Sequence, residues 1–225
     1  MSVTKNLRFA INLGNAVLAR ELPDGSPGGI TVQLARKIAA ELGCSAQLKT
    51  YPAAGKVVED AQKDYWDIAF LAVDPQRETI LQFTQPYITI QGTVLVHEGS
   101  SWQSVEQMDK PGVVINVGKG AAYDLHLTRH LQHATLNRLA SSQAAIDAFL
   151  QGEGDMAAGI RQPLERTSAA HSGYRVLPDN FGQIHQAICV PRGNEQRYHQ
   201  LVEMLTRWQV DGAVQGIIDR ELAMA

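Results

Sequence analysis

The chain has 225 residues, of which 44% are hydrophobic and 19% charged, and its formal net charge is −3 at pH 7. A chain with this charge has no basic footprint, so we expect no nucleic-acid partner. No apolar run approaches the roughly 20 residues of a membrane-spanning helix, and the length suits one domain or two lobes of about 100 residues each.

Short apolar runs alternate with amphipathic stretches, which predicts an α/β architecture. In the first half, apolar residues at helical spacing predict a helix over 31–42, which Gly43 ends. A short helix is expected over 57–62. Strands are expected over 7–12, 46–51, 67–72 and 93–97.

The same order of elements returns after a polar stretch at 99–103. It predicts strands over 113–117, 136–139 and 156–160, and helices over 121–130, 143–150, 195–208 and 212–222. Because the order strand, glycine loop, helix occurs in both halves, two βαβ-type lobes joined by extended segments explain the pattern.

Four segments, in order along the chain, resemble the extracellular solute-binding proteins that serve polar amino-acid transporters. They are the helix Gly29–Gly43, the group Trp66–Ala69 with Pro75-Gln76-Arg77 and Phe83–Tyr87, the strand segment Gly152–Ala157, and the segment Trp208–Gly212. The resemblance implies a type II periplasmic-binding-protein-like fold, with a ligand cleft between two α/β lobes and two hinge crossovers. Lobe 1 would comprise 1–91 and 188–225, and lobe 2 would comprise 92–187, with hinges near 88–96 and 184–190.

The resemblance also implies a small-molecule ligand, an ABC transporter permease as partner and a periplasmic location. We expect a monomer without cofactor or metal. Residues 1–6 lack the apolar segment of a signal peptide, which indicates a trimmed mature form or a cytoplasmic protein. Cys44 and Cys189 are the only cysteines, and their apolar surroundings favour two free core thiols over a disulfide.

Arg77 is the main candidate for ligand binding. It stands where the family's arginine binds the ligand's carboxylate, and a guanidinium can make two parallel hydrogen bonds that a lysine cannot reproduce. Without the resemblance, Arg77 would be interpreted as a surface arginine following Pro75. In the family, the other side of the carboxylate is held by a turn that corresponds here to Gly118–Ala122. Ala121 and Ala122 would offer backbone N–H groups at a helix start, although a plain strand-to-helix turn has the same sequence.

Departures from the family pattern concern the ligand's amine. The segment around Ala72 and Asp74 lacks the usual Thr or Ser, and the expected second-lobe acid falls at Ile160, with Arg161 beside it. Because an unpaired buried ammonium is costly, this favours a small carboxylate that is not a standard α-amino acid, although Asp74 could still receive an amine. Further candidate ligand contacts, each with a structural alternative, are Asn12, Asn15 and Tyr123.

Two other functions stay open on the same scaffold: a dehydratase of the cyclohexadienyl or prephenate type, and a ligand-sensing domain. A dehydratase needs a general acid with a tuned pKa, for which Glu21, Asp74 and Asp124 are candidates without a diagnostic setting. His126, His130 and His133 are spaced to share one helix face. We interpret that face as solvated rather than metal-binding.

Overall fold

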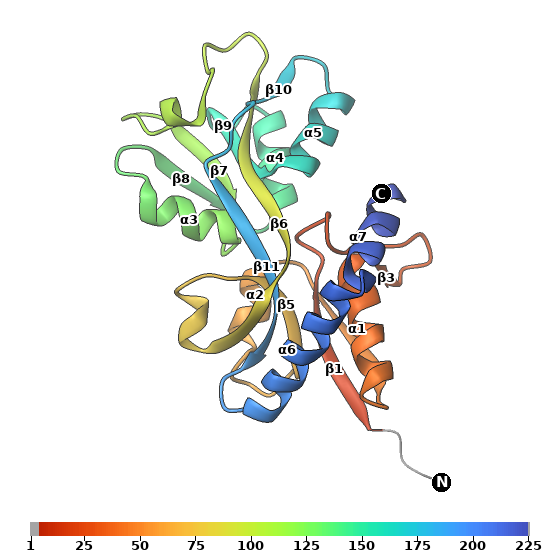
Figure 1. Ribbon diagram of the computed structural model, residues 1–225. Helices are drawn as coiled ribbons and strands as arrows, with labels where there is room; N and C mark the ends of the chain where they lie inside the picture. Colours follow the sequence, from red (N-terminus) through yellow and green to blue (C-terminus); the bar gives the residue numbers. More distant parts are fainter. Residues whose placement is uncertain (1–4, 225) are drawn as a thin grey trace. The chain divides into compact units, whose positions relative to one another are not determined.

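The computed structural model describes residues 5–224 (Figure 1). The chain forms two compact units: unit 1 comprises the residues up to Ile88 and from His185 onward, and unit 2 comprises Thr89–Ile184. The chain passes between the units within strand β6 (Leu81–His97) and returns within strand β11 (Gly182–Pro191). These divisions stand at 88/89 and 184/185, whereas the sequence predicts lobe boundaries at 91/92 and 187/188.

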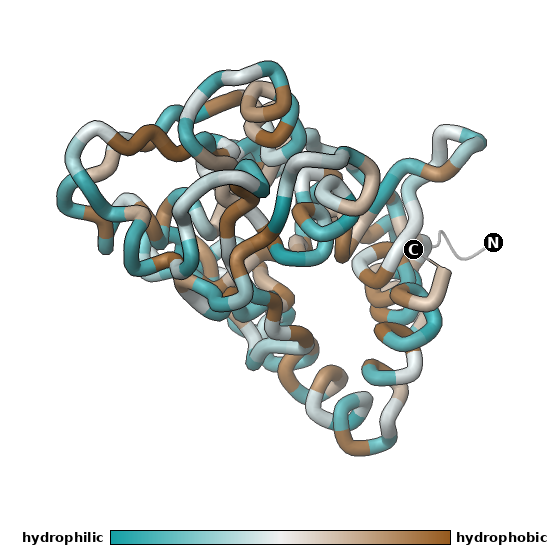
Figure 2. The backbone as a smooth tube through the Cα atoms, turned by 90° about the horizontal axis from the view of Figure 1, so that it is seen from above, coloured by the Kyte–Doolittle hydropathy of each residue, from teal (hydrophilic) through white to brown (hydrophobic). Residues whose placement is uncertain are grey.

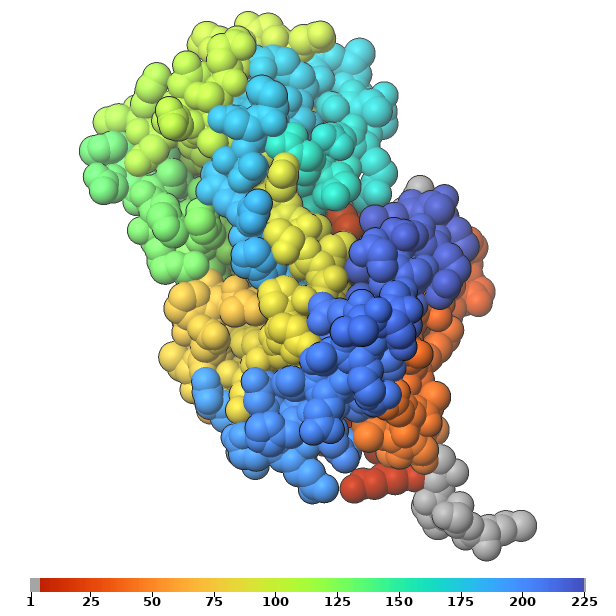
Figure 3. Space-filling view, in the orientation of Figure 1, coloured from red at the N-terminus to blue at the C-terminus, as the bar shows by residue number. Residues whose placement is uncertain are grey.

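Unit 1 is built on three parallel strands extended by one antiparallel strand. β1 (Asn6–Asn12) pairs in parallel with β4 (Ser45–Tyr51) and β5 (Ile68–Ala72), and β5 pairs antiparallel with β11. The other elements are the hairpin β2 (Arg20–Glu21) and β3 (Pro27–Gly28) and the helices α1 (Ile30–Glu41), α2 (Ala54–Glu59), η1 (Arg77–Thr79), α6 (Glu195–Val210) and α7 (Ala213–Ala223). Helices α6 and α7 contact each other, and α7 also contacts α1 (Figure 1; Figure 3).

Alternation along the strands of unit 1 gives the sheet two apolar faces. The Phe9 and Phe70 rings stack with centroids 6.3 Å apart on one face. The neighbouring positions Ala69 and Leu71 belong to a separate buried cluster with Trp66. The buried side chains of α1 recur at helical spacing, as predicted, at Ile30, Leu34 and Ile38 among others. Both faces of β5 are therefore buried, which is typical of parallel sheets. In the edge strand β4, only Tyr51 is buried.

Unit 2 repeats this plan. β7 (Val114–Gly118) pairs in parallel with β8 (Thr135–Leu139) and β9 (Met156–Ile160). Strand β6 pairs antiparallel with β9 and with β10 (Tyr174–Val176). The helices are η2 (Val105–Met108), α3 (Ala122–His130), α4 (Ser142–Leu150) and α5 (Arg161–Ala170), and the buried cluster of the unit contains Leu95, Ile146, Phe149, Ala157 and Leu164.

The predicted helices and strands are all present, with two corrections of extent. The helix predicted over 57–62 is α2, which begins at Ala54 and ends at Glu59. The strand predicted over 93–97 is only the end of β6, a strand of 17 residues. Its earlier part contains Pro86, a residue that strands usually exclude, but β-branched and aromatic residues around it favour an extended chain.

The sequence predicts no element between 161 and 191, where the structure has α5, β10 and β11. Pro163 lies in the first turn of α5, where the missing N–H costs no helical hydrogen bond. Most side chains of α5 are polar, and among its residues only Leu164 is buried. A helix with so narrow an apolar stripe is difficult to detect from periodicity.

Within the described residues, Cys44 and Cys189 are free thiols, as predicted. None of the described helices combines the length and apolar character that a membrane crossing requires. Figure 2 shows hydrophobic and hydrophilic residues interspersed along the backbone.

Candidate ligand-binding site

The predicted ligand-binding residues of unit 1 follow the carboxyl ends of its parallel strands. β1 ends at Asn12 and β5 at Ala72, and the pairing of Ala10 with Ala69 sets both ends at the same edge of the sheet. Ligands of open α/β sheets bind outside this edge. We call the group Asn12, Asn15, Ala72, Asp74 and Arg77 the unit 1 edge.

Arg77 is the buried cation of the unit 1 edge. It begins η1 and is only 2% exposed. Its Nη1 donates to the carbonyl oxygen of Ala72 at 3.1 Å. Burial lowers the pKa of Arg77 and the negative charge of Asp74 raises it, but a guanidinium stays protonated in proteins. A permanent positive charge is therefore held at the end of β5.

Asp74 shapes the loop that carries Arg77. It is 2% exposed, and its Oδ1 accepts a hydrogen bond from the backbone N–H of Gln76 at 2.9 Å. Its carbonyl oxygen accepts from the N–H of Glu78 at 2.9 Å. This is the local turn that aspartate side chains favour, so Asp74 has a structural role whether or not it contacts a ligand.

Asn12 and Asn15 stabilise the loop after β1. The side-chain oxygen of Asn12 accepts from the N–H of Gly14 at 2.8 Å, and that of Asn15 accepts from the N–H of Val17 at 3.2 Å. The turn-stabilising interpretation therefore holds for both carbonyl oxygens. Contact of these residues with a ligand remains a prediction.

Unit 2 presents the corresponding edge of its own sheet. β7 ends at Gly118 and β9 at Ile160, and the parallel pairing of Asn116 with Ala157 sets these ends side by side. A Cβ at Gly118 would lie 2.6 Å from the backbone nitrogen of Ser142, so only glycine allows the start of α4 to pack here. We call the group Ala121, Ala122, Tyr123 and Arg161 the unit 2 edge.

Helix α3 begins without a side-chain cap. Its N-cap residue is Ala121, whereas α4 begins at Ser141, whose hydroxyl accepts from the N–H of Ala144 at 3.0 Å. The first N–H groups of a helix have no partner within the helix, and they suit an anion. An uncapped start after a glycine turn is consistent with the predicted backbone anion site.

The Tyr123 hydroxyl is bonded inside unit 2. It accepts from the N–H of Gly118 at 3.0 Å and donates to Oγ of Ser142 at 2.8 Å. Burial raises the pKa of Tyr123, so the hydroxyl remains protonated and able to donate. Tyr123 therefore joins the end of β7 to the start of α4, and its contact with a ligand remains a prediction.

Arg161 is also engaged within unit 2. Its guanidinium donates to Oε1 of Gln91 at 2.8 Å and to the carbonyl oxygens of three successive residues, Leu177 at 3.1 Å, Pro178 at 3.3 Å and Asp179 at 2.7 Å. These bonds fasten the segment before β11 to the start of α5. They give Arg161 a positioning role that the sequence does not reveal, and its predicted ligand contact remains a prediction.

The histidines of α3 differ from expectation. Helix α3 ends at His130, so His133 lies outside it. The ring of His126 stacks on His130 at 4.1 Å, and its Nε2 lies 3.0 Å from the carbonyl oxygen of Phe181. The interpretation as a solvated face is therefore wrong for His126, which packs against the chain before β11. Residues 5–224 contain no group of three or more His, Cys, Asp or Glu side chains that could hold a metal ion.

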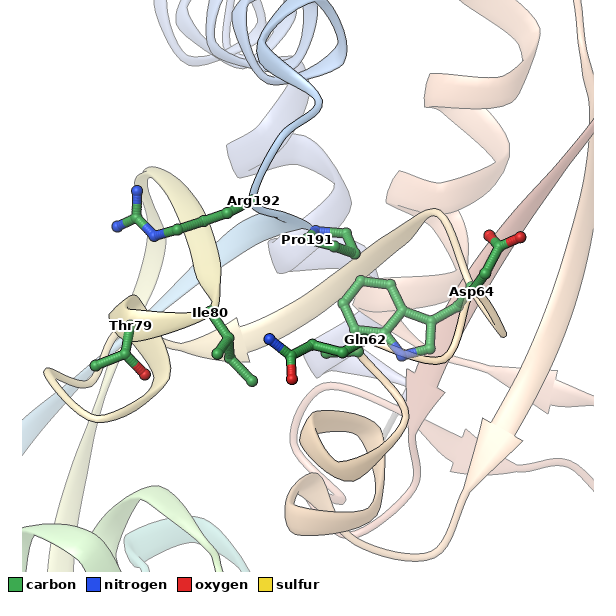
Figure 4. Close-up of a pocket in the computed structure, with 8 residues that line it drawn as sticks. Gln62, Asp64, Thr79, Ile80, Pro191 and Arg192 are labelled. Atoms are coloured by element: carbon green, nitrogen blue, oxygen red, sulfur yellow. The ribbon is translucent and has the colours of Figure 1, made fainter.

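Two hollows lie within the units. One, of about 400 Å³ in unit 1, lies between the turn after α2, the end of η1 and the end of β11 (Figure 4); its lining includes Gln62, Asp64, Thr79, Ile80, Pro191 and Arg192. The other, of about 370 Å³ in unit 2, is lined by residues of η2, α3 and the segment before β11. No predicted ligand-binding residue lines either hollow.

One polar residue near the unit 1 edge was not singled out from the sequence. Gln186 lies on β11, is 5% exposed and pairs with Ala72. The available signal was a single glutamine directly before the apolar run Ala187–Val190.

The architecture is that of a two-unit α/β binding protein with type II periplasmic-binding-protein fold. The family model of the bacterial extracellular solute-binding proteins, family 3, matches residues 8–222, and the chain belongs to this family. A solved structure of similar fold is the amino-acid ABC transporter substrate-binding protein AbpA of Streptococcus pneumoniae bound to L-arginine. It has a TM-score of 0.84 and 18% identity, with 97% of this chain and 94% of that chain covered.

Two relatives point to different activities. The chain is 21% identical over 198 residues to the amino-acid-binding protein AabA of Dichelobacter nodosus, covering 86% of this chain and 78% of that protein. It is 25% identical over 138 residues to the cyclohexadienyl dehydratase of Pseudomonas aeruginosa, covering 59% of this chain and about half (51%) of the enzyme. The chain is thus a solute-binding protein of the amino-acid ABC transporter type, with an enzyme among its relatives.

Proposed function

We propose that this protein binds a small carboxylate through Arg77 and delivers it to an ABC transporter permease. The observation that carries the proposal is the buried guanidinium at the end of β5, held by the carbonyl oxygen of Ala72. A guanidinium has five N–H donors in a fork, so a bond to Ala72 is compatible with bidentate binding of a carboxylate. A second anion-binding feature lies in unit 2, where the first N–H groups of α3 lack a side-chain cap.

We propose further that the ligand is not a standard α-amino acid. Ile160, where the family has its amine-binding acid, is an apolar residue and 8% exposed. The carboxylate of Asp74 is the remaining acidic group of the unit 1 edge, and it already accepts a backbone N–H. An ammonium would therefore lack its usual counter-charge from unit 2, which is costly in a desolvated site.

Export and a periplasmic or extracellular location are part of the same proposal. The family's description as extracellular solute-binding proteins supports delivery to a transporter over intracellular sensing. We propose that the protein acts as a monomer, each copy presenting one ligand site. Secretion of the native gene product, measured by fractionation, would support delivery, and retention in the cytosol would favour a sensor.

The test is Arg77→Ala, with binding measured by calorimetry against carboxylates identified by native mass spectrometry of the purified protein. Affinity should fall at least about 100-fold, since a desolvated charged partner is lost, while far-ultraviolet circular dichroism stays unchanged. The matched control is Arg166→Ala, because Arg166 is an exposed arginine on α5. Unchanged affinity in Arg77→Ala would overturn the proposal.

A dehydratase is the second candidate, and the similarity to the cyclohexadienyl dehydratase favours it. The candidate general acids Asp124 and Glu21 give the dehydratase little support. Asp124 accepts from the N–H of Gly120 at 2.8 Å and is ion-paired with Arg138 at 2.9 Å, while Glu21 lies exposed on the β2–β3 hairpin. Incubation with prephenate should yield no product, and formation of phenylpyruvate would establish the enzyme instead.

A further inference from the structure

Gln186 is a buried polar residue beside the proposed carboxylate site. It lies on β11 within unit 1 and is 5% exposed. The next four residues of the strand, Ala187–Val190, are at most 1% exposed and apolar. No hydrogen bond joins its side-chain amide to any described residue. Gln186 is also not among the described residues that have a fully buried polar side-chain atom without a partner. Its amide atoms therefore reach solvent and can form hydrogen bonds to water or to a ligand.

The strand pairing directs Gln186 toward Ala72. The backbone N–H of Val73 donates to the carbonyl oxygen of His185 at 2.8 Å. In an antiparallel pair the hydrogen-bonded and non-hydrogen-bonded positions alternate, so Ala72 and Gln186 form a non-hydrogen-bonded pair. The side chains of such a pair lie on the same face, with Cα atoms about 4.5 Å apart. The small Ala72 side chain leaves that space open to the longer glutamine.

The same alanine also anchors Arg77. The Ala72 carbonyl oxygen accepts the Nη1 bond of Arg77 at 3.1 Å. The amide of Gln186 and the guanidinium of Arg77 therefore flank one residue, at the carboxyl edge of the parallel strands. A carboxylate on Arg77 would thus lie beside the residue that Gln186 faces across the strand pair.

We propose that Gln186 determines ligand specificity by hydrogen bonding to an oxygen substituent on the carbon next to the carboxylate. The proposal rests on carboxylate binding at Arg77. An amide carries both a donor and an acceptor but no charge, so it serves a hydroxyl or keto oxygen and gives an ammonium no counter-charge. The ligand class that follows is a 2-hydroxy or 2-oxo acid.

The experiment compares acids that differ only at the second carbon. One series is propionate, lactate, pyruvate and alanine, and a bulkier one is 3-phenylpropionate, phenyllactate, phenylpyruvate and phenylalanine. Thermal shift and calorimetry would be run on the unsubstituted protein, on Gln186→Leu, and on Gln183→Leu as a control, because Gln183 lies exposed on the same strand.

In at least one series, the protein without a substitution should bind the 2-hydroxy or 2-oxo acid at least about tenfold more tightly than two other acids of the series. These are the acid that has no substituent on the second carbon and the 2-amino acid. Gln186→Leu should remove that difference, and Gln183→Leu should keep it. The ligand-free melting temperature of Gln186→Leu should not fall, because no existing hydrogen bond is lost.

Four results would overturn the inference. An equal loss for all members of a series in Gln186→Leu would show a merely structural role, as would a lowered ligand-free melting temperature. A preference for the amino acid would exclude the 2-oxygenated class while leaving carboxylate binding intact. If no acid binds the unsubstituted protein, the proposed function fails and this inference fails with it.

Discussion

The two units present the same strand edge with different chemistry. At the unit 1 edge, Arg77 and Asp74 are both only 2% exposed, so side-chain charge is buried there. At the unit 2 edge, alanines begin an uncapped helix, and the charged Arg161 is hydrogen-bonded to oxygens of its own unit. One architecture can thus carry charge recognition in one unit and backbone recognition in the other. Substitution of the edge arginine should therefore chiefly change affinity for Arg77 in unit 1 and chiefly stability for Arg161 in unit 2.

The largest effect is expected from Arg77→Lys. Lysine keeps the charge but loses the planar fork, so the affinity for a carboxylate should fall about 100-fold, or about 2.7 kcal/mol. Calorimetry would measure it. Lys119→Ala, which removes an exposed cation from the turn before α3, should change the affinity by less than about threefold. Equal losses from both substitutions would mean that net charge alone attracts the ligand, and the contrast between the units would disappear.

The second effect concerns Arg161, whose four hydrogen bonds lie within unit 2. Arg161→Ala leaves those oxygens without their charged donor and should lower the free energy of unfolding by about 2 kcal/mol. Urea unfolding would measure it, and Arg166→Ala should stay within about 0.5 kcal/mol. Affinity of the folded protein should change little. A loss of affinity without a loss of stability would instead make Arg161 a ligand contact.

A smaller effect tests the backbone donors of α3. Ala121→Asp supplies the missing N-cap and should stabilise the fold by about 1 kcal/mol. The new carboxylate would occupy the N–H groups and repel an anion, so affinity should fall about tenfold. Ser141→Ala, which removes the existing cap of α4, should lower stability by a similar amount without changing affinity. If Ala121→Asp stabilises the protein and leaves affinity intact, the ligand does not use the start of α3.

The periodicity of apolar residues and the positions of glycines predicted most helices and strands, because these elements depend on interactions between residues close in sequence. The apolar spacing of α1 and the strand β9, Met156–Ile160, follow from residues close in sequence. Helix α5 and strand β11 did not follow, since α5 is mostly polar and β11 depends on pairing with β5, far away in the chain. Long-range pairing leaves little signal in a single segment.

The candidate site divides in the same way. The sequence could place Arg77 after a buried strand, but its bond to the Ala72 carbonyl depends on how the loop folds. The engagement of Arg161 by Gln91 and of Tyr123 by Ser142 joins residues far apart in sequence. The position of Gln186 near the proposed site follows only from the strand register, which pairs it with Ala72.

The smallest effects are expected from one carboxylate in each unit, Asp67 in unit 1 and Asp109 in unit 2. In unit 1, burial alone would raise the pKa of Asp67, but hydrogen bonds and charge from Arg8 outweigh it and lower that pKa. In unit 2, backbone N–H groups of Ala134, Gln132 and His133 lower the pKa of Asp109. Both carboxylates therefore stabilise the folded state above their unfolded pKa of about 3.9, and this stabilisation is lost as the pH falls through the lower folded-state pKa.

Asp67→Asn should lower the free energy of unfolding near neutral pH by at most about 1 kcal/mol, because the ion pair is partly exposed. Asp109→Asn should also destabilise the protein, and each variant should have a flatter dependence on pH below about 4. Urea unfolding at several pH values, repeated in 1 M NaCl, would separate stabilisation by the Arg8 side chain from stabilisation by backbone N–H groups. Salt should screen the contribution of Asp67 more than that of Asp109, since Asp67 is paired with the charged Arg8 while Asp109 is bonded chiefly to backbone N–H groups. Equal salt sensitivity would contradict this difference between the two carboxylates, one paired with a charged side chain and the other with backbone N–H groups.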